Sequence, residues 1–198
     1  MFFERLCAVC AGAAGPVCDD CGQRLRPARH SRSDVPRAAF VLDAASRPVI
    51  TALKYRGERW LAGWAGAAIV DLVPRLADAI CWVPATPERV RWRGYDQGRE
   101  IAREVGRTTG VPSARLLSRD PRDHRQTSRT RAERRHGPTL RAQGDVPSFV
   151  VLVDDVVTTG ATLRTAADAL RAGGADRVVA VAVAATPLPH DRRWAHDG

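Results

Sequence analysis

The 198-residue sequence is poor in lysine, in aromatic residues and in long apolar runs. Lys54 is its only lysine, and the other 30 basic residues are arginines. No run of 18 apolar residues occurs, so no insertion into a membrane is expected. Residues 1–7 have neither the basic nor the apolar region of a signal peptide, which predicts a cytoplasmic protein. With 44% hydrophobic and 27% charged residues, the chain can still bury a core, and its length predicts one compact domain with a small additional module.

The basic charge is concentrated in one part of the sequence. The formal net charge is +9, and residues 89–141 hold 15 arginines against 6 acids, so the whole excess falls there. In the rest of the chain 16 basic and 16 acidic residues cancel. Such a local excess predicts a polyanionic partner that binds in one place.

Four of the five cysteines form two closely spaced CxxC pairs, Cys7 with Cys10 and Cys18 with Cys21. In a reducing compartment disulfides are a poor explanation for this pattern, whereas two CxxC hooks supply the tetrahedral sulfur shell that Zn²⁺ prefers. A redox CxxC and unpaired thiols are the alternatives. We expect a structural zinc ion rather than a catalytic one. The fifth cysteine, Cys81, lies in an apolar run and is expected to be a buried small residue.

The order of apolar segments predicts an α/β domain with a doubly wound parallel sheet. The expected organisation is a cysteine module and linker at 1–37, the main domain at 38–186 and a tail at 187–198. Predicted strands cover residues 39–42, 79–83, 149–153 and 178–184. Predicted helices cover residues 47–55, 60–77, 97–107 and 162–172.

The most informative motif, DDVVTTGAT, begins at Asp154 directly after an apolar strand. A parallel strand delivers two acids at its carboxyl end, where open α/β sheets bind ligands. The Thr-Gly loop then leads into a helix, so that backbone N–H groups, hydroxyls and the helix dipole converge on an anion. Acids beside such a cradle require sugar hydroxyls or a metal ion such as Mg²⁺, and a ribose phosphate supplies the hydroxyls. The plain alternative is an acidic strand end followed by a capped helix.

This motif resembles the 5-phosphoribosyl-1-pyrophosphate (PRPP) signature of type I phosphoribosyltransferases. The resemblance implies that Asp154 and Asp155, as the catalytic pair, face the ribose 2′ and 3′ hydroxyls directly or through hydrated Mg²⁺. It also implies that the loop wraps the 5′-phosphate. The PRPP-binding set is then Asp154, Asp155, Val156, Val157, Thr158, Thr159, Gly160, Ala161 and Thr162.

A second segment, from Val83 to Gln97, resembles the corresponding segment of the ComF family, competence-associated proteins similar to phosphoribosyltransferases. The four-cysteine module, the Leu-Lys-Tyr-x-Gly stretch that contains Lys54, and Gln126 with the later Ala-Glu-Arg also match that family. The resemblance implies that the loop after Val83 holds the pyrophosphate side of PRPP. The residues expected there are Ala85, Thr86, Arg91 and Arg93, since arginine pairs well with phosphate oxygens.

The chain departs from the ComF pattern at Tyr95 and Asp96, where the family usually has Phe-Asn, and near His136, where an Asn is expected. Asp96 would place a negative charge near an anion site, so we expect it to cap the helix that begins at Gln97 instead. Lys54 has two interpretations, a phosphate contact or a solvated residue at a helix end.

Residues 115–136 contain eight arginines and three acids. In phosphoribosyltransferases the corresponding region is a hood or mobile loop over the second substrate. A segment this basic also suits single-stranded nucleic acid, with Arg129, Arg131 and Arg134 as phosphate contacts and with Trp92 and Tyr95 as stacking residues. A solvated loop and ordinary core aromatics are the alternative.

Two functional hypotheses follow from these motifs. In the first, the chain is a Mg²⁺-dependent phosphoribosyltransferase that acts on PRPP by electrostatic stabilisation and orientation. In the second, the site binds PRPP only as a ligand, and the protein binds single-stranded DNA in uptake or processing, with DNA-uptake or recombination proteins as partners. The intact acid and Thr-Gly motif favours the first hypothesis, and the basic segment favours the second.

Overall fold

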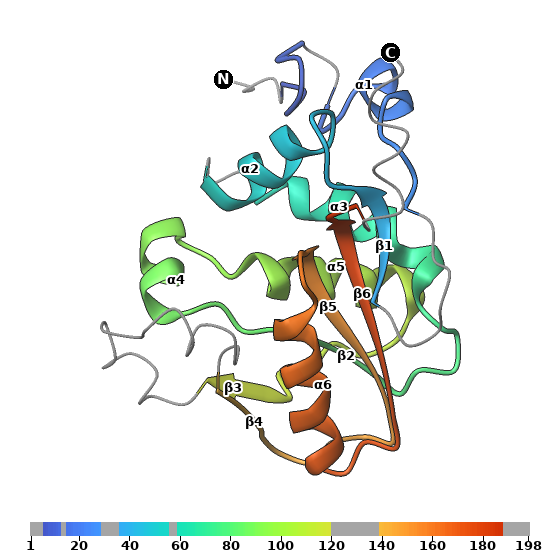
Figure 1. Cartoon of the computed structure of the whole chain (residues 1–198), viewed down its shortest axis with the longest axis vertical. Coiled ribbons are helices and arrows are strands. Elements are labelled where there is room, and N and C mark those ends of the chain that lie inside the picture. The colour runs from blue at the N-terminus through green and yellow to red at the C-terminus, as the bar shows by residue number, and fades with distance from the viewer. Residues whose placement is uncertain (1–5, 13–14, 29–35, 56–58, 120–138, 188–198) are drawn as a thin grey trace.

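The computed structural model describes residues 6–12, 15–28, 36–55, 59–119 and 139–187. In these ranges a central sheet contains four parallel strands in the order β1–β6–β5–β2 (Figure 1). The strands are β1 (Arg37–Val41), β2 (Ala79–Trp82), β5 (Phe149–Val157) and β6 (Arg177–Ala185). The expected α/β architecture with a parallel sheet is therefore confirmed.

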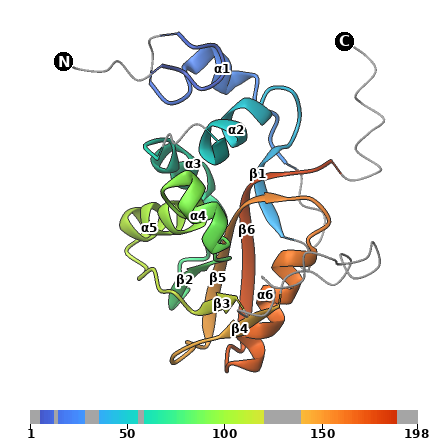
Figure 2. The same ribbon diagram turned by 90° about the vertical axis from the view of Figure 1, so that its left-hand side faces the viewer.

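Helices cover both faces of the sheet, as Figure 2 shows. On one face lie α2 (Arg47–Tyr55), α3 (Leu61–Ile69) and α5 (Gln97–Thr109), and on the other lies α6 (Ala161–Ala172). Strand β5 explains why both faces need cover. Its residues 151 and 153 pack in the core on the α3 and α5 side, and its residues 150 and 152 pack against α6. A strand with apolar side chains in both directions is stable only between two layers.

Helix α5 is amphipathic, packs one face against the sheet and has well-defined ends. Its buried face includes Ile101 and Val105. Asp96 caps the first turn by accepting a hydrogen bond from the Arg99 N–H, and Gly110 ends the helix in a left-handed conformation with φ +77°. The expected capping role of Asp96 is thus confirmed.

The helix expected over residues 60–77 is shorter than predicted. Helix α3 ends at Ile69, a 3-10 turn follows at Val70–Leu72, and Val73 is extended with ψ 120°. Pro74 explains the break, because a proline disfavours helical backbone in the residue before it and has no N–H for the helix. Short elements were also missed: α4 (Pro87–Arg93) and the antiparallel pair β3 (Leu117–Arg119) with β4 (Leu140–Ala142).

The cysteine module packs on the side of the sheet that α2 and α3 cover. It contains the short helix α1 (Asp19–Gln23), and Ala8 is buried in the same core cluster as α2 and α3. Part of the segment expected to be a linker runs antiparallel along β1, with Val41 N–H donating to Arg26 and Ala28 N–H donating to Ala39. Within the described ranges, no helix combines the length and the apolar character that a membrane crossing requires.

Candidate functional site

The two acids of the motif lie inside β5, which continues past the predicted end at 153 to Val157. Side chains alternate between the faces of a strand, so the neighbouring acids point to opposite sides of the sheet. Asp155 accordingly meets α2 and α5, whereas Asp154 lines a hollow with residues 156–163 at the start of α6. The two carboxyl groups therefore have different surroundings and different chemistry.

Asp155 is 4% exposed and both of its carboxylate oxygens are bonded. Lys54 Nζ lies 2.9 Å from Oδ1, and Gln97 Nε2 donates to Oδ2 at 3.0 Å. Gln97 Oε1 in turn accepts a hydrogen bond of 2.8 Å from Arg93. The ion pair and the amide tie α2, α5 and β5 together, so Lys54 is not a solvated helix end, and its contact with phosphate stays a prediction.

Tyr95 supports this network from below the surface. It is 4% exposed, and its hydroxyl donates to the backbone carbonyl of Leu53, the residue before Lys54. The prediction that Tyr95 stacks on bases is therefore wrong, because its ring is in the core and its one polar atom already has a partner. A buried tyrosine needs such a partner, and here that partner fixes the end of α2.

Asp154 is half-buried and has fewer partners. Its Oδ1 accepts the Asp155 N–H at 2.8 Å. Burial and the charge of Asp155 raise the pKa of Asp154 to about 7, and the Asp155 N–H, Lys54 and Arg119 offset this only in part. A carboxyl with such a pKa exchanges its proton near neutrality, which suits a group that must gain a cation or a hydroxyl as a partner.

The loop after β5, residues 158–162, is the segment expected to bind an anion and is called the anion cradle here. Gly160, with φ +73°, lets the chain turn from the strand into α6, and Thr158 and Thr159 are exposed beside it. The first helical hydrogen bond runs from Arg164 N–H to Gly160. The N–H groups of residues 162 and 163 therefore have no acceptor within the helix. They point out of the N-terminal end of α6, where the helix dipole is positive. A small hollow at this place is lined by Asp154 and residues 156–163.

The residues predicted for the pyrophosphate side fall into different environments. Ala85 N–H donates to Asp96 Oδ2 at 3.0 Å, so this amide already has a partner. Thr86 caps α4 by accepting a hydrogen bond from the Arg89 N–H. The Asp96 carboxylate therefore lies at this loop and holds its backbone through the Ala85 N–H.

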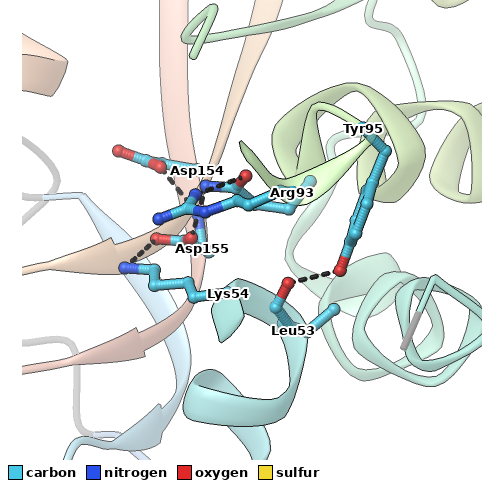
Figure 3. A network of polar contacts seen from close by, with 7 residues as sticks. Leu53, Lys54, Arg93, Tyr95, Asp154 and Asp155 are labelled. Atoms are coloured by element: carbon cyan, nitrogen blue, oxygen red, sulfur yellow. Dashed lines mark hydrogen bonds and ion pairs between the residues drawn. The ribbon is translucent and has the colours of Figure 1, made fainter. Parts of the chain in front are cut away.

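Only one of the two predicted arginines is linked to the acid pair. Arg91 is exposed and lies 3.6 Å from Glu88 on the surface of α4. Arg93 instead is joined to Asp155 through Gln97, as the dashed lines in Figure 3 show, and its buried Nε has no hydrogen-bond partner among the described residues. Its guanidinium is thus held by Gln97 with donor capacity left over.

Two residues of the site, Gln97 and Arg119, were not predicted from the motifs as parts of it. Gln97 binds Asp155 beside Lys54, and Arg119 of β3 donates a 2.6 Å hydrogen bond to the carbonyl of Pro84 in the loop after β2. The signal for Gln97 was its place on the buried face of an amphipathic helix, where a polar side chain needs a partner. Arg129, Arg131 and Arg134 fall outside the described residues.

The four N-terminal cysteines form a separate cluster. Their Sγ atoms all lie within 4.8 Å of one another, and Cys10 and Cys18 Sγ are 3.7 Å apart. Four sulfurs at 2.3 Å from a tetrahedral Zn²⁺ would be about 3.8 Å apart, so the residues fit this ion. Burial raises the pKa of Cys7, but backbone N–H groups of Cys10, Cys18 and Val9 outweigh it and lower that pKa to about 6. Hydrogen bonds of this kind orient metal-binding groups.

Comparisons with known proteins found one family model and several solved structures that this chain resembles. Residues 99–196 match the family model described as the phosphoribosyl transferase domain. A solved structure of the allosteric regulatory enzyme of purine biosynthesis is 25% identical with a TM-score of 0.45, over 62% of this chain and 25% of that one. The glutamine PRPP amidotransferase of B. subtilis is 26% identical with a TM-score of 0.45, over 61% of this chain and 25% of that one. The chain therefore spans about a quarter of these enzymes.

Orotate phosphoribosyltransferase from Aeropyrum pernix is 17% identical with a TM-score of 0.43, over 90% of this chain and 96% of that one. None of the curated protein sequences matches. The parallel sheet and the family model together define a type I phosphoribosyltransferase domain. The chain is a phosphoribosyltransferase-like protein with a four-cysteine cluster at its N-terminal end.

Proposed function

We propose that this chain binds PRPP with Mg²⁺ and transfers its phosphoribosyl group. The observation that carries the proposal is the anion cradle at residues 158–162 with the half-buried carboxyl of Asp154 beside it. A 5′-phosphate in the cradle would meet the free amides at the start of α6 and the threonine hydroxyls. The ribose hydroxyls would then lie toward Asp154.

The two acids take different roles in this proposal. Asp154 Oδ2 is available for ribose hydroxyls or a hydrated Mg²⁺, whereas Asp155 keeps its bonds to Lys54 and Gln97 and positions the strand end. Mg²⁺, when bound, would neutralise charge on the pyrophosphate as it leaves the sugar. Arg93, whose buried Nε has no partner in the described part of the chain, would supply the second positive charge on that side. Catalysis of this kind is electrostatic and orientational.

A thermal-shift titration tests the site. PRPP with Mg²⁺ should raise the melting temperature by several degrees, because a ligand at a hundred times its Kd adds about 2.7 kcal/mol. Asp154→Asn should abolish most of the shift, and the shift should grow between pH 6 and pH 8 as Asp154 loses its proton. Arg91→Gln, a change of an exposed arginine on the same helix as Arg93, is the matched control. Absence of a shift at millimolar PRPP would rule the site out.

Release of pyrophosphate tests the chemistry separately. Incubation with PRPP, Mg²⁺ and a panel of bases and amines should release pyrophosphate with one acceptor class and not with Asp154→Asn. Binding without any release across the panel would leave PRPP as a ligand only, and the transferase part of the proposal would be abandoned.

We propose as a second function that the chain, as a protein of the ComF type, binds single-stranded DNA in uptake or processing. The supporting observation is an exposed aromatic pair next to the site. Trp92 is 66% exposed and Tyr55 is 58% exposed, and their ring centroids are 5.6 Å apart. Arg93 lies 5.4 Å from the Tyr55 ring. Exposed rings with nearby arginines are suited to stacking on unpaired bases.

Binding of a fluorescent oligonucleotide at several salt concentrations tests this function. Affinity should fall steeply with salt, and Trp92→Ala with Tyr55→Ala should weaken it about tenfold or more, since base stacking contributes about 1–3 kcal/mol per base. Neutralising Arg129, Arg131 and Arg134 should reduce the salt dependence. The control is Leu76→Ala, which removes an 86% exposed side chain at another place on the surface. If the affinity changes neither with salt concentration nor on replacement of Trp92 and Tyr55, the proposal of DNA binding is wrong.

A further inference from the structure

A groove that the proposed function does not use runs between α6 and the strands β1 and β6. Its volume is about 470 Å³, within the range of small-molecule sites. It shares Leu163 with the hollow of the anion cradle but no other residue. Valine and alanine side chains of β6, together with Leu163 and Ala167, give it an apolar floor.

The groove has a strong excess of positive charge. Four arginines line it, and Asp168 is its only acid among the described residues. The four are Arg37, Arg164, Arg171 and Arg177. Asp168 pairs with Arg171 at 3.0 Å, which leaves three guanidinium groups without a carboxylate in this groove.

The positive groups are held at both ends of the groove. Arg164 NH1 donates to the Thr159 carbonyl at 2.9 Å, which fixes this guanidinium next to the loop after β5. Arg171 lies two turns further along α6, about 10 Å away along the helix axis. Arg177 stacks on the Phe149 ring with its guanidinium carbon 4.4 Å from the ring centroid. Arginines held in this way lose little side-chain entropy when they bind an anion.

We propose that this groove is a second anion-binding site, which takes a small phosphorylated ligand with an apolar body, of the size of a mononucleotide. Guanidinium groups pair with phosphate oxygens, and the apolar floor accepts a planar ring or a hydrocarbon part. An inorganic anion would leave that floor in water, and a long polyanion would exceed a groove of this volume. The inference does not depend on PRPP binding at the cradle.

Calorimetric titration of the full chain with AMP tests the proposal. We use AMP because its phosphate, ribose and base match the groove's charge and floor, and adenosine is the control ligand without the phosphate. Arg37→Gln with Arg177→Gln should weaken AMP binding in the groove at least tenfold, and adenosine should bind far more weakly than AMP. Arg75→Gln with Arg103→Gln removes the same charge from exposed positions that do not line the groove and should leave AMP binding unchanged.

AMP also resembles the ribose-phosphate half of PRPP, so a cradle variant separates the two sites. Thr158→Glu places a carboxylate in the cradle and should remove only the cradle's share of binding. AMP binding that survives Thr158→Glu and is lost in the double arginine variant supports the groove, even if PRPP binding fails. AMP binding that is lost in Thr158→Glu and unchanged in the double arginine variant would overturn it. If poly-glutamate binds to the arginines of the groove and AMP does not bind there, the assignment of a small ligand would also be overturned.

Discussion

Replacing Asp155 by alanine should lower the free energy of unfolding by about 3 kcal/mol. Breaking a buried ion pair by removing one partner costs about 3–5 kcal/mol, because the other charge is left without compensation. The lower end applies here, since the Lys54 side chain is 22% exposed and water can reach it. Gln97 also loses the acceptor of its amide group. Chemical denaturation at pH 8 measures the change.

Asp154→Ala is the matched control, since it removes the adjacent carboxyl. The pKa of Asp154 is about 7 in the folded chain and about 3.9 when unfolded, so the folded state binds the extra proton between these values. Its ionised form therefore opposes folding above pH 7 by at most about 4 kcal/mol, and Asp154→Ala should raise stability at pH 8 by up to that amount, less what solvent screening of this half-buried group removes. The gain should vanish at pH 4.

A double variant makes the test of Asp155 sharper. Lys54→Met with Asp155→Leu replaces the ion pair by apolar side chains of similar size and should recover most of the loss seen in Asp155→Ala. If Asp155→Ala proves no more costly than Asp154→Ala, the ion pair with Lys54 does not stabilise the site.

Removing zinc should unfold the N-terminal module while the parallel sheet remains folded. Zinc-binding free energies in small modules are about 10–16 kcal/mol, and the short segments between these cysteines add only a few small apolar side chains, such as Ala8, to the core. We expect one zinc ion per chain, with its loss on treatment with a strong chelator. Limited proteolysis before and after chelation should show new cleavage confined to the first 28 residues.

Cysteine variants distinguish a zinc site from other uses of the thiols. Cys10→Ser should lose the metal and give the same cleavage pattern as the chelated protein. Cys81→Ala removes a thiol of β2 that is fully buried in the core on the α6 side of the sheet, and it should keep the full zinc content. A chain without zinc that resists proteolysis, or zinc retained in Cys10→Ser, would contradict the assignment.

Much of the fold was visible in the sequence because the signals were local. The apolar run of β5 predicts a strand covered on both faces, and Asp96 and Gly110 mark the ends of α5. The two CxxC pairs predict the cysteine cluster, because each hook turns its thiols toward one point. These features depend on residues that are close in the chain.

The parts that sequence reasoning missed depend on contacts between distant segments. Nothing near Lys54 in the sequence indicates that it forms an ion pair with Asp155, about a hundred residues later. Nor does the sequence indicate that Gln97 donates a hydrogen bond to the other oxygen of the same carboxylate. Tyr95 shows a related ambiguity, since an aromatic residue beside arginines suits both a surface and a core. Short strands such as β3 form only because β4 pairs with them, so their own residues carry little pattern.

The lone lysine has a practical consequence for work on this chain. Apart from the α-amino group, Lys54 is its only amine, and that amine forms an ion pair with Asp155 of the site. Reductive methylation with ¹³C-formaldehyde would therefore give one side-chain NMR signal. The labelled methyl groups would be on Lys54 Nζ, which lies 2.9 Å from Asp155 Oδ1. Changes in its chemical shift would report ligand entry directly, without a substituted residue or an assigned spectrum.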